Sequence, residues 1–351
     1  MNSLPAATSS SPVIQVMRAT KQDWPELAEF YAREFNEHPR LNDAKTWQWK
    51  ILEQPTNSPQ VPFFILKVND RIEGGIGYLS FPMCIGQSTI TAIHPVNYFV
   101  NPRYKGLPAL RLLRAVLQEG DIAIGSNLSV VAQQLLEKSG FIDHSAYFFS
   151  YRLLLRITSR STLRGLLVWV WRRARESLLH TLLQLQHRSL TYHIATKLDN
   201  TWLQKASEWP LPGYGIQKSA EYMIWRYARS PLLNCCYIWQ LDNGKPAGLA
   251  VLHFDAHEKA AVLLDLCAAS FESGSFVGLI VAAIQHARSE GMNTFDTHSM
   301  SPQIEAALRR TGCAGYASSL GLVLYSRDTT IARTIEIPGH WHFILGDTDR
   351  Y

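Results

Sequence analysis

The chain has 351 residues, of which 46% are hydrophobic and 18% charged, and its formal net charge is +5. This length suffices for two domains, and the composition excludes a disordered protein. Five scattered cysteines without a Cys-x-x-Cys pair argue against a disulfide framework or a zinc site. The longest apolar run, 166–171, is too short to span a bilayer. Residues 1–12 indicate a disordered lead rather than a signal peptide, so we expect a cytoplasmic protein.

Hydrophobic periodicity predicts alternating strands and helices over 13–157. The order begins with a strand and two helices, continues with three strands, and closes with helix, strand, helix, strand. The expected strands are 13–19, 62–68, 76–85, 89–100, 122–124 and 147–155, and the expected helices are 23–35, 43–52, one after residue 106, and 129–138. This order predicts a mixed α/β domain built around one sheet.

A fainter copy of the same order occupies 199–351. The turn Asp242-Asn243-Gly244-Lys245 between two apolar runs is a strong hairpin signal. The expected strands are 202–206, 235–241, 247–254, 261–268 and 293–297, and the expected helices are 221–229, 276–290 and 302–310. The second half is therefore predicted to be a degenerate repeat of the first.

The two halves are joined by an Arg-rich helical connector over 158–198. Residues 156–190 hold seven Arg and one Glu, which gives this stretch a charge of +6. We favour a helix that packs between the domains with solvated arginines. Peripheral contact with an anionic membrane surface is the alternative, and it ranks above nucleic acid as a partner.

The most informative segment runs from Tyr98 to Leu117, where a strand end leads through a basic loop into an amphipathic helix. Backbone N–H groups at such a helix start, with Arg103 and Lys105 beside them, form a site for a phosphate or pyrophosphate. The Gly-Lys-hydroxyl triplet of a nucleoside-triphosphate loop is absent.

Residues 13–155 resemble an acyl-CoA acyltransferase domain of the GNAT superfamily. The resemblance rests on Phe99-Val-Asn-Pro-Arg-Tyr-Lys-Gly106 before a helix and on Leu136-Glu-Lys-Ser-Gly-Phe141 further along. Residues 199–328 look like a second, degenerate copy, so the chain resembles bacterial tandem GNAT proteins. The resemblance implies two tandem domains, each with a central, mostly antiparallel mixed sheet flanked by helices, and acetyl-CoA or another acyl-CoA as co-substrate.

Carried onto this sequence, the family pattern implies a cofactor site around the loop. The pantetheine arm would bond the backbone of the strand end, and loop amides would hold the pyrophosphate. The implied cofactor-binding residues are Phe99, Val100, Arg103, Tyr104, Lys105, Gly106, Leu107, Pro108, Ala109 and Asn127. Two departures stand out: Pro108 lacks an N–H group, and Leu136 replaces the tyrosine that commonly serves as acid.

Three residues are candidates for the chemistry, each with a structural role as the alternative. His94 has a suitable intrinsic pKa for a base, and Tyr98 or Tyr147 could replace the missing acid. The amide of Val100 is the implied oxyanion donor. Glu37 and His38 are candidates for acceptor binding.

The second half offers fewer candidates. Its loop 271–278 has glycines but no Lys or Arg, so no cofactor is expected there. Aromatic and basic residues on helix 221–229 suggest an acceptor wall or ordinary packing. In the C-terminal segment, His340, His342, Asp347 and Asp349 supply no closed metal set, and we expect no metal.

We therefore expect an N-acyltransferase that acts on an amine, such as an amino-sugar or peptide precursor of a surface polymer. A loose similarity of residues 339–349 to tandem proteins linked to surface polysaccharides supports this acceptor. The alternatives are a Fem-type aminoacyl transferase that uses charged tRNA, and a non-catalytic binding or scaffold protein that keeps the fold.

Overall fold

The computed structural model describes residues 12–34, 43–55, 60–156, 170–171, 174, 190–211, 213–271 and 273–348. The predicted connector lies largely outside these residues, as do Glu37, His38 and Asp349. The chain forms two compact units, and strands β3 and β4 contribute residues to both. Unit 1 comprises Met1–Glu53, Asn57–Leu79 and Pro95–Glu119, and unit 2 comprises Gln54–Thr56, Ser80–His94 and Gly120–Tyr351.

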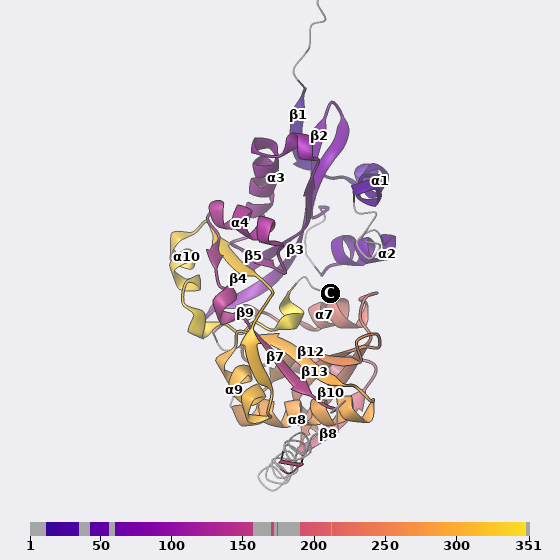
Figure 1. Cartoon of the computed structure of the whole chain (residues 1–351), viewed down its shortest axis with the longest axis vertical. Helices are drawn as coiled ribbons and strands as arrows, with labels where there is room; N and C mark the ends of the chain where they lie inside the picture. The colour runs from indigo at the N-terminus through magenta and orange to yellow at the C-terminus, as the bar shows by residue number, and fades with distance from the viewer. Residues whose placement is uncertain are drawn as a thin grey trace, which may run out of the picture. The chain divides into compact units, whose positions relative to one another are not determined.

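Unit 1 is built on an antiparallel arrangement of β1, β2 and the first part of β3. Figure 1 shows α3 on one side of these strands and α1 and α2 on the other. The elements with residues in unit 1 are β1 (Ile14–Arg18), α1 (Trp24–Glu34), α2 (Ala44–Trp47), the π-helical η2 (Gln48–Leu52), β2 (Phe63–Val68), β3 (Arg71–Ile85), β4 (Ser88–Val100), η3 (Pro102–Tyr104) and α3 (Leu107–Leu117).

Aromatic rings fill the space between α1, α2 and the sheet of unit 1. The rings of Tyr31 and Trp47 lie 4.4 Å apart, and both contact Phe63. Glycine makes this close packing possible, because a side chain at Gly75 or Gly77 would meet the Phe63 ring at 2.7–2.9 Å. The sheet surface therefore carries no side chain where the rings lie.

Unit 2 contains the rest of the first sheet and the whole of the second. Its elements in the first sheet are β5 (Ile122–Ser126), β6 (Ile142–Asp143), β9 (Tyr214–Ile216) and β15 (Leu322–Ser326). Strands β4 and β5 pair in parallel at Ala92 with Ile122 and at Ile93 with Ala123. β15 pairs antiparallel with both β5 and β6.

The second sheet has the strand order β14-β7-β13-β12-β11-β10-β8 among the described residues. Its strands are β7 (Phe149–Leu154), β8 (Leu190–Ala195), β10 (Cys235–Asp242), β11 (Lys245–Asp255), β12 (Ala260–Ala268), β13 (Thr294–Ser299) and β14 (Ala314–Ala317). The helices of unit 2 are α4 (Val130–Lys138), α6 (Asn200–Ala206), α7 (Ala220–Met223), the π-helical η5 (Ile224–Ala228), α8 (Ser273–Ser289), α9 (Pro302–Arg310) and α10 (Thr329–Ile335). The predicted mixed α/β class with two mixed sheets and flanking helices is confirmed.

Side-chain alternation along β10 places the helices of unit 2 on opposite faces of the second sheet. Ile238 belongs to the buried core formed with α8, which packs against β10, β11 and β12 (Figure 1). The next residue, Trp239, lies on the other face, where its ring is 5.4 Å from Trp202 of α6. In the hairpin between β10 and β11, Asn243 and Gly244 take the positive φ angles that its predicted turn requires.

The structure corrects two predictions about strands. The predicted strand 202–206 is wrong: these residues belong to α6, because Asp199 caps the helix by accepting a hydrogen bond from the Trp202 amide at 3.0 Å. β7 was expected to complete the sheet of the first half, but it pairs with β13 and β14 in the second sheet. The first sheet instead receives β15 from the C-terminal part of the chain. The predicted domain limits stay a prediction.

No helix among the described residues has the length and apolar character needed to cross a bilayer.

Because β7 joins the second sheet and β15 joins the first, we predict that residues 1–157 do not fold alone. In this shortened chain, β6 loses its partner β15, and β7 loses both of its neighbours. Unpaired strand edges are prone to association. We expect no cooperative transition in denaturant unfolding followed by circular dichroism, whereas the full chain shows one. A cooperative, reversible transition of the fragment would contradict this organisation.

Candidate functional site

The turn between β4 and α3 is organised by Asn101. Its side chain accepts a hydrogen bond from the Arg103 amide at 3.1 Å and donates one to Glu73 at 2.7 Å. Its carbonyl accepts a hydrogen bond from the Tyr104 amide at 2.8 Å. The amides of Arg103 and Tyr104 are therefore already used within the turn, although the sequence predicted both to hold the pyrophosphate.

The remaining amides of the turn are open. Among the described residues, the N–H groups of Lys105, Gly106, Leu107 and Ala109 have no hydrogen-bond partner, as expected at and just before a helix start. Gly106 has a φ of 95°, and a Cβ built there would meet nothing within 4 Å. The side chains of Arg103 and Lys105 are exposed beside these amides. Four amide donors and two cations thus share one accessible turn.

Strand β4 approaches this turn in a distorted conformation. Asn97 has a φ of 53°, which Asn tolerates better than most residues, and its carbonyl accepts a hydrogen bond from the Tyr31 hydroxyl. Tyr98 donates a hydrogen bond to the carbonyl of Ala109 at 2.8 Å, and burial raises its pKa to about 12. This bond ties the end of the strand to the first turn of α3. The predicted role of the Tyr98 hydroxyl as an acid stays a prediction.

The other predicted site residues lie in varied surroundings. His94 is buried, with its Nε2 3.0 Å from the Ser126 hydroxyl. Tyr147 is 47% exposed. Val100 is buried against Gly74 of the neighbouring strand. Asn127 is exposed with a φ of 54°. Their predicted catalytic and cofactor roles, and that of Phe99, stay predictions.

In the second half, the C-terminal segment 341–348 lies where two parallel strands part. β12 and β13 pair from Ala260 with Thr294 to Val262 with Asp296. Further along, Ile344 forms an antiparallel bridge with Ser299 of β13. A Cβ on Gly346 would be 2.6 Å from the Leu264 carbonyl of β12. We call this segment, 341–348, the C-terminal plug.

Buried charges hold the plug in place. The Lys218 ammonium is 3.0 Å from Asp265 of β12 and also pairs with Asp347 of the plug. Burial alone would lower the pKa of Lys218, but the two carboxylates raise it well above its usual value. Arg226 donates hydrogen bonds to the carbonyls of Gly346 and Thr348. The plug is thus bound by both backbone and side chains.

The aromatic residues of the predicted acceptor wall are buried. Tyr222, Trp225 and Tyr227 are each less than 5% exposed, and the Tyr227 hydroxyl donates to Asp265 at 2.7 Å. Tyr227 supports Asp265, and Arg226 binds the plug. Of the two interpretations that the sequence left open for 221–229, an acceptor wall or ordinary packing, this burial matches ordinary packing.

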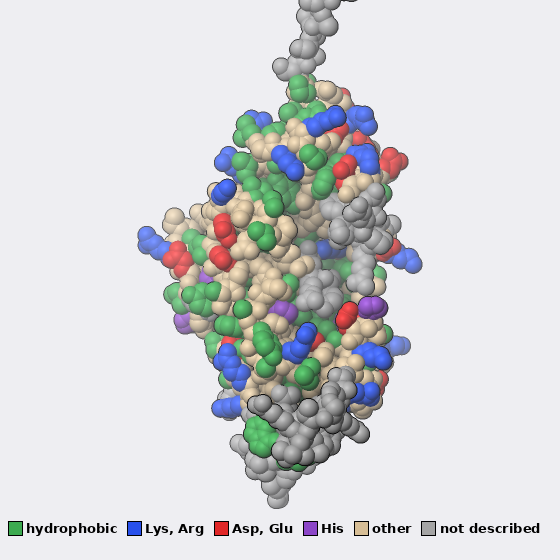
Figure 2. Space-filling view, in the orientation of Figure 1, with side chains coloured by type: hydrophobic (Ala, Val, Ile, Leu, Met, Phe, Trp, Pro, Cys, Tyr) green, Lys and Arg blue, Asp and Glu red, His purple; other side chains and the backbone are tan. Residues whose placement is uncertain are grey.

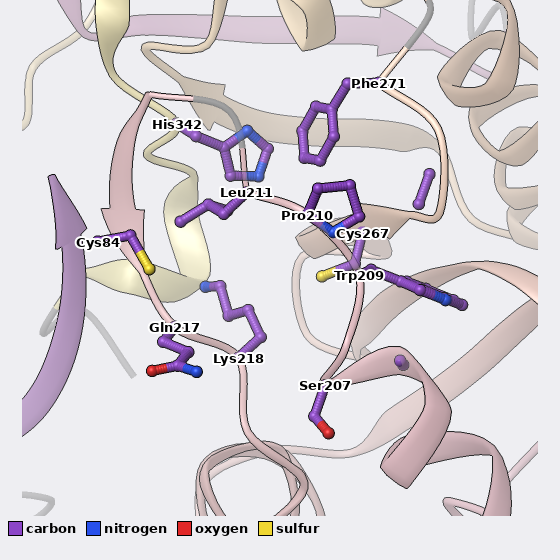
Figure 3. Close-up of a pocket in the computed structure, with 12 residues that line it drawn as sticks. Cys84, Ser207, Trp209, Pro210, Leu211, Gln217, Lys218, Cys267, Phe271 and His342 are labelled. Atoms are coloured by element: carbon purple, nitrogen blue, oxygen red, sulfur yellow. The ribbon is translucent and has the colours of Figure 1, made fainter. Parts of the chain in front are cut away.

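A pocket of about 90 Å³ adjoins the plug in unit 2 (Figure 3). Lys218 and His342 line it together with Phe271, Trp209, Cys84 and Cys267. The sequence did not predict this pocket. The available signal was Asp265, a single acid within the apolar run 260–268, because a buried carboxylate needs a partner.

Metal binding and nucleic-acid binding are two chemistries that the sequence analysis did not favour. Among the described residues, no three His, Cys, Asp or Glu side chains form a group that could hold a metal. On the face drawn in Figure 2, the described Lys and Arg side chains are scattered among hydrophobic and acidic ones. This face therefore shows no continuous basic patch of the kind that nucleic acids require.

Docking of the plug predicts different effects for two glycines of the C-terminal region. Gly346→Ala should lower the free energy of unfolding by about 1–3 kcal/mol, because the new methyl group overlaps the Leu264 carbonyl and the Tyr227 hydroxyl. Gly339→Ala is the matched control, since its Cβ would meet nothing within 4 Å. Denaturant unfolding measures both, and equal effects would show that the plug is not docked in this way.

Burial of His342 predicts a loss of stability in acid. Burial and the nearby Lys218 lower its pKa to about 4, from an ordinary value of 6.5. The unfolded chain therefore binds a proton more readily, and this stabilisation is present above pH 6.5 and lost as the pH falls to 4. The loss amounts to about 3 kcal/mol for this group. In His342→Gln, unfolding measured between pH 6.5 and 4 should be less pH-dependent by that amount; an unchanged pH dependence would contradict it.

No family model and no curated protein matches the sequence. Solved structures match it over most of its length. A probable N-acyltransferase of Enterococcus faecalis is 9% identical, with a TM-score of 0.59 over 90% of this chain and 73% of that one. A GCN5-related N-acetyltransferase of Anabaena variabilis is 13% identical, with a TM-score of 0.58 over the same shares, 90% and 73%. The N-myristoyltransferase of Saccharomyces cerevisiae is 9% identical, with a TM-score of 0.51 over 92% and 81%. The chain therefore has the fold of the GCN5-related N-acetyltransferase (GNAT) superfamily.

Proposed function

We propose that the protein transfers an acyl group from an acyl-CoA to an amine, and that the CoA pyrophosphate binds at the turn between β4 and α3. The observation that carries the proposal is the cluster of open amides at this turn. Backbone N–H groups at a helix N-terminus and adjacent cations stabilise a phosphate group. The fold supports the same reaction class, since one solved neighbour is an N-myristoyltransferase with bound myristoyl-CoA.

The hydrogen bonds within the turn limit the amides that could hold the pyrophosphate. The amides of Lys105, Gly106, Leu107 and Ala109 are the donors, while those of Arg103 and Tyr104 already serve Asn101. Pro108 contributes no donor, but it is tolerated early in a helix. The exposed cations Arg103 and Lys105 supply charge, and Gly106 leaves room for the phosphate oxygens.

The pantetheine arm would follow the backbone of β4 at Phe99 and Val100. The distortion at Asn97 precedes this stretch, and the Tyr98–Ala109 hydrogen bond fixes its position relative to α3. In this arrangement the Val100 amide would stabilise the developing oxyanion. Because the Tyr98 hydroxyl donates a hydrogen bond to the Ala109 carbonyl, we assign it the role of orienting α3 in this proposal.

The acceptor in this proposal is an amine on an amino-sugar or peptide precursor of a surface polymer. Its support is the similarity of residues 339–349 to proteins of that kind. Fem-type transfer from charged tRNA has less support, because its basis is the Arg-rich connector, which lies largely outside the described residues, whereas the turn between β4 and α3 favours CoA.

The proposal is tested by ligand-induced stabilisation. Saturating acetyl-CoA, or a longer acyl-CoA, should raise the melting temperature, because a ligand at 100 times its Kd adds about 2.7 kcal/mol of stability. Gly106→Glu should abolish the shift, since it places a carboxylate among the amides that would hold the pyrophosphate.

Gly86→Glu is the matched control. Gly86 is also exposed, also has a positive φ, and has open space around its Cβ, but it lies in the turn between β3 and β4. This variant should keep the full shift. Absence of any shift with the unmodified protein would overturn the acyl-CoA proposal, and an equal loss in both variants would place the cofactor elsewhere. A shift without acyl transfer to any amine would favour the binding or scaffold alternative.

A further inference from the structure

The pocket beside the C-terminal plug contains an unused hydrogen-bonding atom. His342 is 1% exposed, and its Nε2 has no hydrogen-bond partner among the residues that the structure describes. Buried polar atoms nearly always have a partner, so an orphan of this kind requires an explanation. His342 lines the pocket, and Figure 3 shows its ring at one end, next to Phe271.

Neighbouring hydrogen bonds determine which nitrogen of His342 carries the proton. Nδ1 lies 3.2 Å from the Ser301 hydroxyl oxygen, and that hydroxyl donates its own hydrogen to Gln303 at 3.3 Å. With the single serine hydrogen assigned to Gln303, the Ser301 oxygen accepts from Nδ1–H. Nε2 is therefore the unprotonated nitrogen, with its lone pair available. The pocket wall therefore presents Nε2 as a hydrogen-bond acceptor.

The ring is held firmly in this orientation. The backbone amide of His342 donates to the Tyr214 carbonyl of β9 at 2.7 Å. The Phe271 ring meets the imidazole edge to face at 5.2 Å. His342 is thus fixed on one side by backbone and on the other by Ser301 and Phe271. A site with a preformed acceptor loses little entropy when a ligand binds.

Charges around the pocket select against an ionic ligand. Lys218 lines the pocket, and its positive charge disfavours a second cation beside His342. Its ammonium is already paired with Asp265 and Asp347, which are 0% exposed, so it offers little attraction to an anion. Apolar and aromatic side chains, including Trp209, Leu211 and Phe271, form much of the remaining wall.

The size of the pocket indicates how a ligand enters. Its volume of about 90 Å³ exceeds the roughly 10–15 Å³ that one water needs. It is smaller than the roughly 150 Å³ of a closed cavity that binds benzene. A ligand would therefore insert one end, while its remainder extends past the half-exposed side chains of Trp209 and Phe271.

We propose that this pocket binds the end of an uncharged ligand that carries an O–H or N–H donor on an apolar body, with the donor bonded to His342 Nε2. The site is distinct from the turn proposed for acyl-CoA and needs no acyl-CoA to form. It uses Cys267 and Ala268 at the end of β12 and Phe271 shortly before α8, whereas the turn after β4 has Gly106 and two cations.

The test uses phenol as the probe, with toluene and benzylammonium as matched controls. Toluene has the same shape without the donor, and benzylammonium has donors but carries a charge. In protein with ¹⁵N-labelled histidine and no acyl-CoA, the His342 Nε2 resonance should show an unprotonated nitrogen and should shift as phenol is added. Phenol should bind about tenfold more tightly than either control, the range expected for one hydrogen bond to a buried acceptor.

Two variants locate the binding. His342→Phe keeps a ring but removes the acceptor, and it should weaken phenol binding about tenfold. His144→Phe is the control, because His144 is another buried histidine with unpartnered nitrogens outside the pocket, and it should leave phenol binding unchanged. If His342→Phe fails to fold, the Nε2 resonance of the unmodified protein still decides.

Three results would overturn the proposal. These are a protonated Nε2, an Nε2 resonance that no probe shifts because the pocket holds water only, and toluene binding as tight as that of phenol. None of them depends on acyl-CoA binding, so this proposal and the proposed function can fail separately.

Discussion

The buried ammonium of Lys218 is the constraint on which the arrangement of unit 2 depends. Its side chain is only 7% exposed, and an unpaired charge in such a place is strongly destabilising. Two carboxylates neutralise it, one from β12 and one from the plug, so the strand and the C-terminal segment must meet at this point. Tyr227 then orients Asp265, and Arg226 binds the carbonyls that flank Asp347. The position of His342, and with it the pocket, follows from this anchoring.

The two halves use the same strand-to-helix junction for different chemistry. After β4 comes a turn with Gly106, exposed cations and open amides, which suits an anion. After β12 comes Phe271, whose ring packs against Phe276 and His342 and lines an uncharged pocket. In addition, the plug covers the place where β12 and β13 part. The turn after β4 is thus suited to a phosphate, while the second sheet encloses the C-terminal plug.

Local sequence signals predicted most elements, because their causes lie within a few residues. Short apolar runs identified β2, β11 and β12, and the Asn243-Gly244 turn identified the hairpin between β10 and β11. The phosphate turn was equally visible, since Gly106 and the cations beside it are adjacent in the chain. The wrong prediction of a strand at 202–206 also has a local cause. Asp199 caps α6, and this outweighs the strand propensity of the residues after it. Long-range choices had no such signal. Nothing near β7 or β15 indicates which sheet each will join.

The sequence by itself determined the class of fold, the order of its elements and the phosphate-like turn, since periodicity, caps and turn residues act over short distances. The bonds by which Asn101 occupies two amides of that turn are equally local, although the sequence analysis assigned those amides to the pyrophosphate. Only the tertiary structure decided how distant segments meet. It also brought Lys218, Asp265 and Asp347 together from three separate parts of the chain. Burial made their pairing obligatory, and it left His342 with an acceptor that no neighbour satisfies.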